Sequence, residues 1–256
     1  MKALIKLHLK ENLKGRSFIL FGILGGLVSL ILLTGGLIIV ENNPTEEAIS
    51  QLGTQWKLLS IISGFAAVTV SMGTIERHLK EKRAELLALH GLAFDRQLFS
   101  LAIGNSLVSM MLSAILTLVF VLIIIIDQAP TNLLGFTAAF ISYLLSTGIV
   151  ALIVSTLNMF LPGIVVAVLG VFLVIIGSFH QVIQGMLLNN GQLAGRILAK
   201  IMDFIPPLDV FNRLTRSLFF LEFKDGRDLI VFLIFIWLTL TVVFLASKGV
   251  SRREKI

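Results

Sequence analysis

The residues best suited to recognition chemistry lie in one charged segment, residues 76–96. Acidic and basic side chains alternate there, and Glu76 and Lys80 stand four residues apart in the order that favours an ion pair on a helix. This spacing predicts a short two-faced helix up to His90, with Gly91 as its C-cap. Such a helix can dock onto a protein. The side chains expected to contact that partner are Glu76, Arg77, Lys80, Glu81, Arg83, Glu85, Leu86 and Leu89.

The same segment has a plainer interpretation as a basic loop that only orients the chain in a membrane. Such a loop needs basic residues but no ordered helix with an apolar stripe. An apolar stripe interrupted by Lys82 is present, and it consists of Ile75, Leu79, Leu86 and Leu89. The residues of this segment alone leave both interpretations open.

Catalytic and metal chemistry have little support in these residues. The chain has no cysteine, which excludes thiolate nucleophiles, thiolate metal sites and disulfides. The four histidines stand apart at the expected ends of helices, so we expect each to be a surface residue rather than part of a zinc site or a catalytic set. They are His8, His78, His90 and His180. We therefore expect no catalytic residue and no metal site.

The composition indicates that lipid surrounds most of the chain. Hydrophobic residues make up 56% of the 256 residues, charged residues only 14%, and the mean hydropathy is +0.97. We predict an all-α integral membrane protein, because helices satisfy every backbone group within the segment that crosses the bilayer. The net charge of +6 fits basic cytoplasmic loops, so we expect no nucleic-acid partner.

Six apolar runs are long enough to cross about 30 Å of hydrocarbon as helices of about 20 residues. We predict a single transmembrane domain, residues 1–256, with spans at about 17–40, 58–75, 97–126, 133–154, 163–179 and 229–246. Asp95 is the expected N-cap of the third span, and a tight turn is expected within residues 155–163. Asn105 is the most notable polar residue in the third span, where we expect an interhelical hydrogen bond rather than a role in a substrate pathway.

The charges predict that both ends of the chain are cytoplasmic. Residues 1–16 interleave leucines with basic residues, which predicts a helix on the membrane surface. The basic residues expected at this interface are Lys2, Lys6, Lys10 and Lys14. The acidic connection 41–47 is expected outside, whereas the basic segment 76–96 and the basic C-terminal tail are expected inside.

Residues 180–228 are too polar to cross, and a six-span topology places this loop outside. It contains two amphipathic stretches, residues 196–205 and 211–221, both suited to the membrane interface. Two prolines, Pro206 and Pro207, end the first stretch, and Asp209 is the expected N-cap of the second.

Four features together carry a resemblance: the basic amphipathic N-terminus, the charged segment at 73–87 after the second span, the six spans, and the paired amphipathic stretches before the sixth. Over nearly the whole chain this organisation resembles the permease subunit of the type-2 ATP-binding-cassette exporter family. The resemblance implies that residues 1–16 are an elbow helix, that residues 76–90 are a coupling helix seated in an ATPase, and that the external helices dip into the outer leaflet. The turn after His90 lacks the proline that many family members have there.

The resemblance implies a non-catalytic transport subunit in the plasma (inner) membrane. ATP and Mg²⁺ would bind a separate ATPase, since this chain contains no Gly-x-x-x-x-Gly-Lys-Ser/Thr phosphate loop and is expected to bind no cofactor itself. The other implied partners are membrane lipids and a second permease, either a copy of this chain or a homologue. Two alternatives stay open, a membrane scaffold or sensor that recruits a cytoplasmic protein, and an intramembrane lipid-processing enzyme.

Overall fold

The computed structural model describes residues 2–13, 20, 23, 27, 44–80, 83–126, 133–189, 193–220 and 226–253. This part of the chain is helical and contains no strand, so the all-α prediction is confirmed for it. The predicted first span, residues 17–40, lies outside the described residues apart from Leu20, Ile23 and Leu27, and Lys14 and Glu81 also lie outside them. The helices are α1 (Lys2–Leu13), α3 (Pro44–Ser71), α4 (Thr74–Lys80), α5 (Arg83–Leu89), α6 (Phe94–Ile126), α7 (Leu133–Asn158), α8 (Gly163–Ser178), α9 (His180–Asn189), α10 (Leu193–Met202), α11 (Leu208–Phe220) and α12 (Arg227–Arg253).

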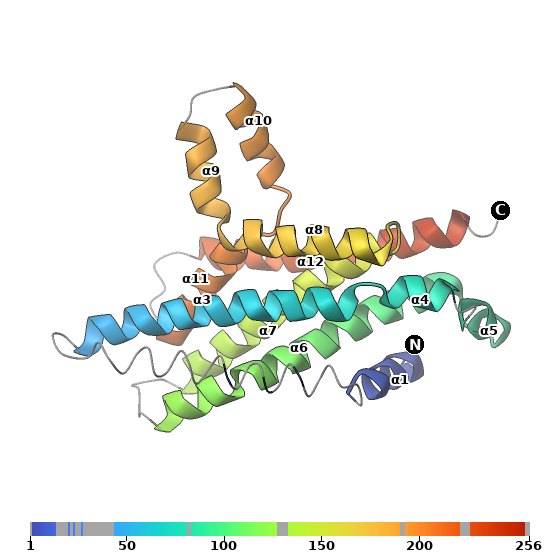
Figure 1. Ribbon diagram of the computed structural model, residues 1–256, viewed down its shortest axis with the longest axis horizontal. Helices are drawn as coiled ribbons and strands as arrows, with labels where there is room; N and C mark the ends of the chain where they lie inside the picture. Colours follow the sequence, from blue (N-terminus) through green and yellow to red (C-terminus); the bar gives the residue numbers. More distant parts are fainter. Residues whose placement is uncertain are drawn as a thin grey trace.

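The long helices form a bundle, and different short helices lie at its two ends (Figure 1). α3, α6, α7, α8 and α12 run roughly lengthwise, and α1, α4, α5 and the last turns of α12 lie together at one end. The hairpin of α9 and α10 projects sideways near the other end. The chain therefore returns to the end that carries α1 after α3, after α7 and after α12.

Four described stretches are long and apolar enough to cross a membrane: Trp56–Lys80, Phe94–Leu118, Leu134–Asn158 and Arg227–Arg252. α8 has only 16 residues, about 24 Å at 1.5 Å per residue, and passes the same test only together with α9, to which it is bent by 75°. α8 and α12 also expose large apolar side chains, among them Ile164, Phe172 and Trp237. An apolar surface of this kind suits contact with lipid rather than water.

Glycine and small polar residues bring the helices of the bundle close together. A Cβ on Gly64 of α3 would lie 2.8 Å from Val174 of α8, and a Cβ on Gly170 of α8 would lie 2.8 Å from Val68 of α3. Tyr143 of α7 is fully buried and shares a hydrogen bond with the Ser63 hydroxyl of α3. Small residues at these positions allow the close backbone approach that stabilises helix pairs in membranes.

The structure corrects two helix boundaries. α7 continues to Asn158, beyond the predicted end of the fourth span at residue 154, and the predicted turn lies at residues 159–162. α6 begins at Phe94, so Asp95 lies in the first turn of the helix rather than at its N-cap. A carboxylate in that turn still stabilises the positive end of the helix dipole.

The two amphipathic stretches of residues 180–228 have different surroundings. α11 buries Phe211 and Leu214 in the core, where the Phe211 ring lies 5.0 Å from the Phe232 ring of α12. α10 packs on α9, where Gly195 lies against the backbone of Leu187. Ala199 of α10 is buried, whereas Ile197, Leu198 and Ile201 are exposed. Asp209 lies in the first turn of α11, and one oxygen of its carboxylate accepts the backbone N–H of Gln181 at 2.7 Å, so it caps α9. The other oxygen accepts the backbone N–H of Val210 in α11 at 2.8 Å.

Candidate partner-docking site

The predicted helix over residues 75–90 is two short helices, α4 and α5, and α5 turns away from the line of α4 (Figure 1). The prediction of a single helix is therefore wrong, and the apolar stripe that Lys82 interrupts is divided between α4 and α5. Ile75 is fully buried and Leu79 packs on the same cluster, which includes Leu98 and Val250. Leu86 and Leu89 of α5 are 58% and 82% exposed. Ile75 and Leu79 thus anchor the segment in the core, and Leu86 and Leu89 are exposed on its surface.

α4 is held by a helix cap from α7 and by its own hydrogen bond to the start of α8. The Asn158 side-chain oxygen at the end of α7 accepts the backbone N–H groups of Ile75 and Glu76 at 3.0 and 3.3 Å, as an N-cap does. In return, the Glu76 carboxylate accepts the backbone N–H of Gly163, the first residue of α8, at 2.6 Å. α4 is therefore tied to the turn between α7 and α8 in both directions.

Glu76 also pairs with Lys80, whose Nζ lies 2.6 Å from Oε1. The Lys80 ammonium and the Gly163 N–H both bond to the Glu76 carboxylate. Glu76 thus carries negative charge to the start of α8, where the helix dipole favours it.

Gln97 of α6 connects α4, α5 and the loop after them. Its side-chain oxygen accepts a hydrogen bond from His78 Nε2 at 3.0 Å, and its nitrogen donates to the backbone carbonyls of Ala84 and Leu92 at 3.1 and 2.8 Å. Gln97 is fully buried. The apolar pattern of the sequence identifies Gln97 only as the start of a span. The one available signal was an amide side chain among apolar residues.

The end of α5 is formed as predicted. Gly91 has φ +81°, its N–H donates to Ala88, and the N–H of Leu92 donates to Leu87 at 3.0 Å. This is a Schellman motif, in which a glycine in the left-handed region satisfies the last carbonyls of a helix. The Gly91 C-cap is confirmed.

α5 displays a face that fits a protein partner. Arg83, Glu85, Leu86 and Leu89 are all exposed on its short length. Arg77 of α4 is exposed as well, and its guanidinium donates to the Gly73 carbonyl at 3.4 Å. Exposed leucines beside charges of both signs have the composition of a protein interface, in which an apolar centre is surrounded by a polar rim.

α1 packs along α6 beside this site. His8 Nε2 donates to the Asn105 side-chain oxygen at 2.7 Å, and Asn105 Nδ2 donates to the Ser155 hydroxyl at 2.9 Å. The interhelical role expected for Asn105 is confirmed, and it links α1, α6 and α7. Gly104 allows this approach, since a Cβ there would lie 2.8 Å from the His8 ring. The three described lysines of α1 are exposed: Lys2, Lys6 and Lys10.

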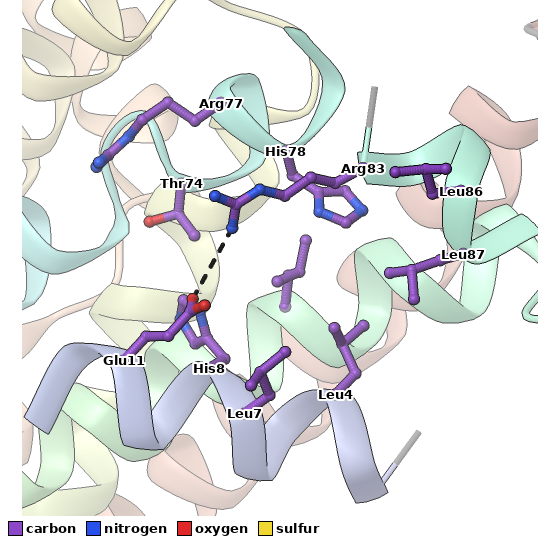
Figure 2. Close-up of a pocket in the computed structure, with 11 residues that line it drawn as sticks. Leu4, Leu7, His8, Glu11, Thr74, Arg77, His78, Arg83, Leu86 and Leu87 are labelled. Atoms are coloured by element: carbon purple, nitrogen blue, oxygen red, sulfur yellow. Dashed lines mark ion pairs between the residues drawn. The ribbon is translucent and has the colours of Figure 1, made fainter. Parts of the chain in front are cut away.

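A hollow of about 480 Å³ lies between α1, α4, α5 and α6 (Figure 2). Leucines line one side of it, and Glu11 and Arg83 approach each other on the other side, with 3.9 Å between Arg83 Nη1 and Glu11 Oε2. His8 and His78 line the same hollow. The site therefore has an outer face on α5 and an inner hollow between α5 and α1.

The expectation that all four histidines are surface residues is wrong for three of them. His8, His78 and His180 are buried, and each ring has a hydrogen-bond partner, respectively Asn105, Gln97 and the Met202 carbonyl. A neutral imidazole with such a partner is tolerated in a core. Within the described ranges, no three His, Cys, Asp or Glu side chains are grouped so that they could hold a metal ion.

No model of a known protein family matches this chain, and a search of the curated proteins finds no match either.

Proposed function

We propose that this chain is the permease subunit of an ATP-binding-cassette transporter, that it exports its substrate, and that a separate ATPase docks on α5. The observation that carries the proposal is the combination of an exposed α5 and an anchored α4. Leu89 is 82% exposed at the end of a helix whose neighbours are held by Asn158, Glu76 and Gln97. A scaffold that only recruits a protein does not need its docking helix connected to several membrane helices.

The contacts provide a route for force. Movement of α5 would act on α6 through Gln97, because Gln97 bonds to the Ala84 carbonyl. It would act on α7 and α8 through α4, whose first turn bonds to Asn158 and whose Glu76 bonds to Gly163. Packed helices joined by discrete hydrogen bonds transmit displacement as units. ATP-driven movement at α5 would thus change how α6, α7 and α8 pack.

The rest of the proposal follows from this role. The chain has six spans, with the first within residues 17–40 and the fifth formed by α8. α1 is the elbow helix, and the α4–α5 segment is the coupling region. α9, α10 and α11 lie towards the external side of the membrane. The termini are cytoplasmic in the plasma membrane, a second permease completes the pathway, and ATP with Mg²⁺ binds only the ATPase. The chain itself performs no catalysis.

The proposal predicts that Leu89→Asp disrupts ATPase binding. Because the side chain is 82% exposed, the substitution should not affect folding, but it places a charge at the centre of the proposed contact. Affinity purification of the tagged chain from its native membranes, followed by mass spectrometry, should recover an ATPase with a phosphate-loop motif. We expect at least about a tenfold lower recovery with L89D, the effect of losing one interface residue worth about 1.4 kcal/mol.

Phe204→Asp is the matched control, because Phe204 is 87% exposed and follows α10, away from the end of the bundle that carries α5. F204D should recover as much ATPase as the unmodified chain. Size-exclusion profiles in detergent should be the same for both variants. The proposal is wrong if L89D and L86D/L89D retain full ATPase binding, or if the protein recovered through α5 has no nucleotide-binding motif. The second result would favour the scaffold or sensor.

A further inference from the structure

The hollow between α1, α4, α5 and α6 has an apolar side and a charged side, an arrangement that the docking role of α5 does not require. Leu4 and Leu7 of α1 and Leu86 and Leu87 of α5 gather on one side, while the guanidinium of Arg83 points across the opposite side towards Glu11 (Figure 2). Its volume of about 480 Å³ lies within the range of about 300–1,000 Å³ typical of small-molecule sites. A ligand that fills it must be apolar at one end and polar at the other.

The hollow offers a guanidinium to which an anion can bind. Arg83 and Glu11 face each other in it, whereas the guanidinium of Arg77 points away from it (Figure 2). Glu11 holds Arg83 only weakly, because the two groups are 3.9 Å apart and both are more than half exposed. A phosphate oxygen can replace this carboxylate at small cost, and arginine binds phosphate with two parallel hydrogen bonds.

The position of the hollow favours a lipid over a soluble anion. Leu7 and Leu86 at its edge are 54% and 58% exposed, so an apolar chain that leaves the hollow can pack against both side chains. The outward side of α1 exposes Lys2, Lys6 and Lys10, and basic residues at a membrane surface attract anionic lipids.

We propose that this hollow binds an anionic phospholipid, with the headgroup phosphate on Arg83 in place of Glu11 and an acyl chain along the leucines of α1 and α5. The lipid would join α1 to α5 in addition to the direct contacts of α1 with α6. This proposal goes beyond the transport role and requires only that the chain is embedded in a membrane.

Native mass spectrometry of the purified full chain, titrated with phosphatidylglycerol or phosphatidylcholine, tests the proposal. We expect saturable retention of phosphatidylglycerol and about tenfold weaker retention by Arg83→Gln, the loss expected for a hydrogen-bonded charge pair. Glu11→Gln should strengthen retention, because it removes the carboxylate that competes for Arg83. Leu7→Gln should weaken it without any change in charge.

Arg96→Gln is the control, because Arg96 is exposed near the start of α6 and does not line the hollow. It should retain phosphatidylglycerol as the unmodified chain does. Equal losses in R96Q and R83Q would mean general charge attraction and would overturn the proposal. Displacement of the lipid by an equal concentration of glycerol phosphate would overturn it in favour of a soluble anion, as would an unchanged affinity in L7Q. Melting temperatures of all variants identify any that fail to fold.

Discussion

His8 joins the N-terminal helix to the bundle through Asn105, and its contribution to stability should depend on pH. Burial lowers its pKa below the ordinary 6.5, while the hydrogen bond to Asn105 and the charge of Glu11 oppose that shift, and His78 and Arg77 add to it. Between the two pKa values the unfolded chain binds more protons than the folded chain. The contribution of His8 to stability is therefore complete above pH 6.5 and decreases as the pH falls below it.

We expect His8→Gln to reduce this pH dependence. The glutamine amide can still donate to Asn105 but does not titrate. Melting temperatures in detergent should fall for the unmodified chain between about pH 7.5 and about pH 5.5, the range in which histidine titrates, and should fall less for H8Q. His90→Gln is the control, since His90 is exposed and its ring bonds to the Leu86 carbonyl, four residues earlier in the chain. Identical pH slopes for H8Q and the unmodified chain would contradict this role of His8.

Among the helices, α3 and α8 fit together through two reciprocal contacts. Gly64 of α3 faces Val174 of α8, and Gly170 of α8 faces Val68 of α3. A Cβ on Gly170 would lie 2.8 and 2.9 Å from the two methyl carbons of Val68, closer than real side chains approach. Since α3 leads directly into α4, this packing also sets the position of the docking segment.

Gly170→Ala should destabilise the protein by about 1–3 kcal/mol, because overpacking of a close helix contact forces the helices apart. Val68→Ala in the same chain should restore most of the loss, since it removes the two methyl carbons that the new Cβ meets. Thermal unfolding of the single and double variants measures the coupling between these positions. Gly185→Ala should be neutral or slightly stabilising because alanine favours helices. Beyond the backbone of α9 itself and the two neighbouring residues, a Cβ at this position meets no atom of the described residues within 4 Å. A double variant as unstable as G170A would contradict the packing argument.

At the scale of the whole molecule, the two ends of the bundle should face opposite sides of the membrane. α5 and the last turns of α12 lie at one end, and α10 projects near the other (Figure 1). The chain has no cysteine, so single cysteines can report on each end without interference.

Glu85→Cys and Arg252→Cys should react with a membrane-impermeant maleimide only after the cells are opened, and Arg196→Cys should react in intact cells. All three positions are exposed in the structure. Arg252 lies outside the proposed ATPase contact, so its reaction reports membrane sidedness even where a docked partner covers Glu85. The cysteine-free chain provides the background. Reaction of E85C and R196C from the same side would exclude a bundle that crosses the bilayer lengthwise.

The pattern of apolar residues predicted the helices well where local interactions decide them. The expected spans at 97–126, 133–154 and 229–246 correspond to α6, α7 and α12, and Gly91 ends α5 as predicted. Helical periodicity, helix-ending glycines and bilayer-length apolar runs can be recognised within a few neighbouring residues. Those features of this protein could therefore be inferred before any packing was known.

The structure of the docking segment could be seen only in the folded chain and could not be predicted from the sequence. Its division into α4 and α5, the caps from Asn158 and Glu76, and the bonds from Gln97 depend on contacts between residues up to 87 positions apart. The burial of His8 likewise depends on Asn105, 97 positions away. Contacts at such separations leave no periodic trace in the sequence, because they depend on which helices pack together and at what depth. The helices were thus encoded locally, whereas their connection into one anchored site was a product of packing.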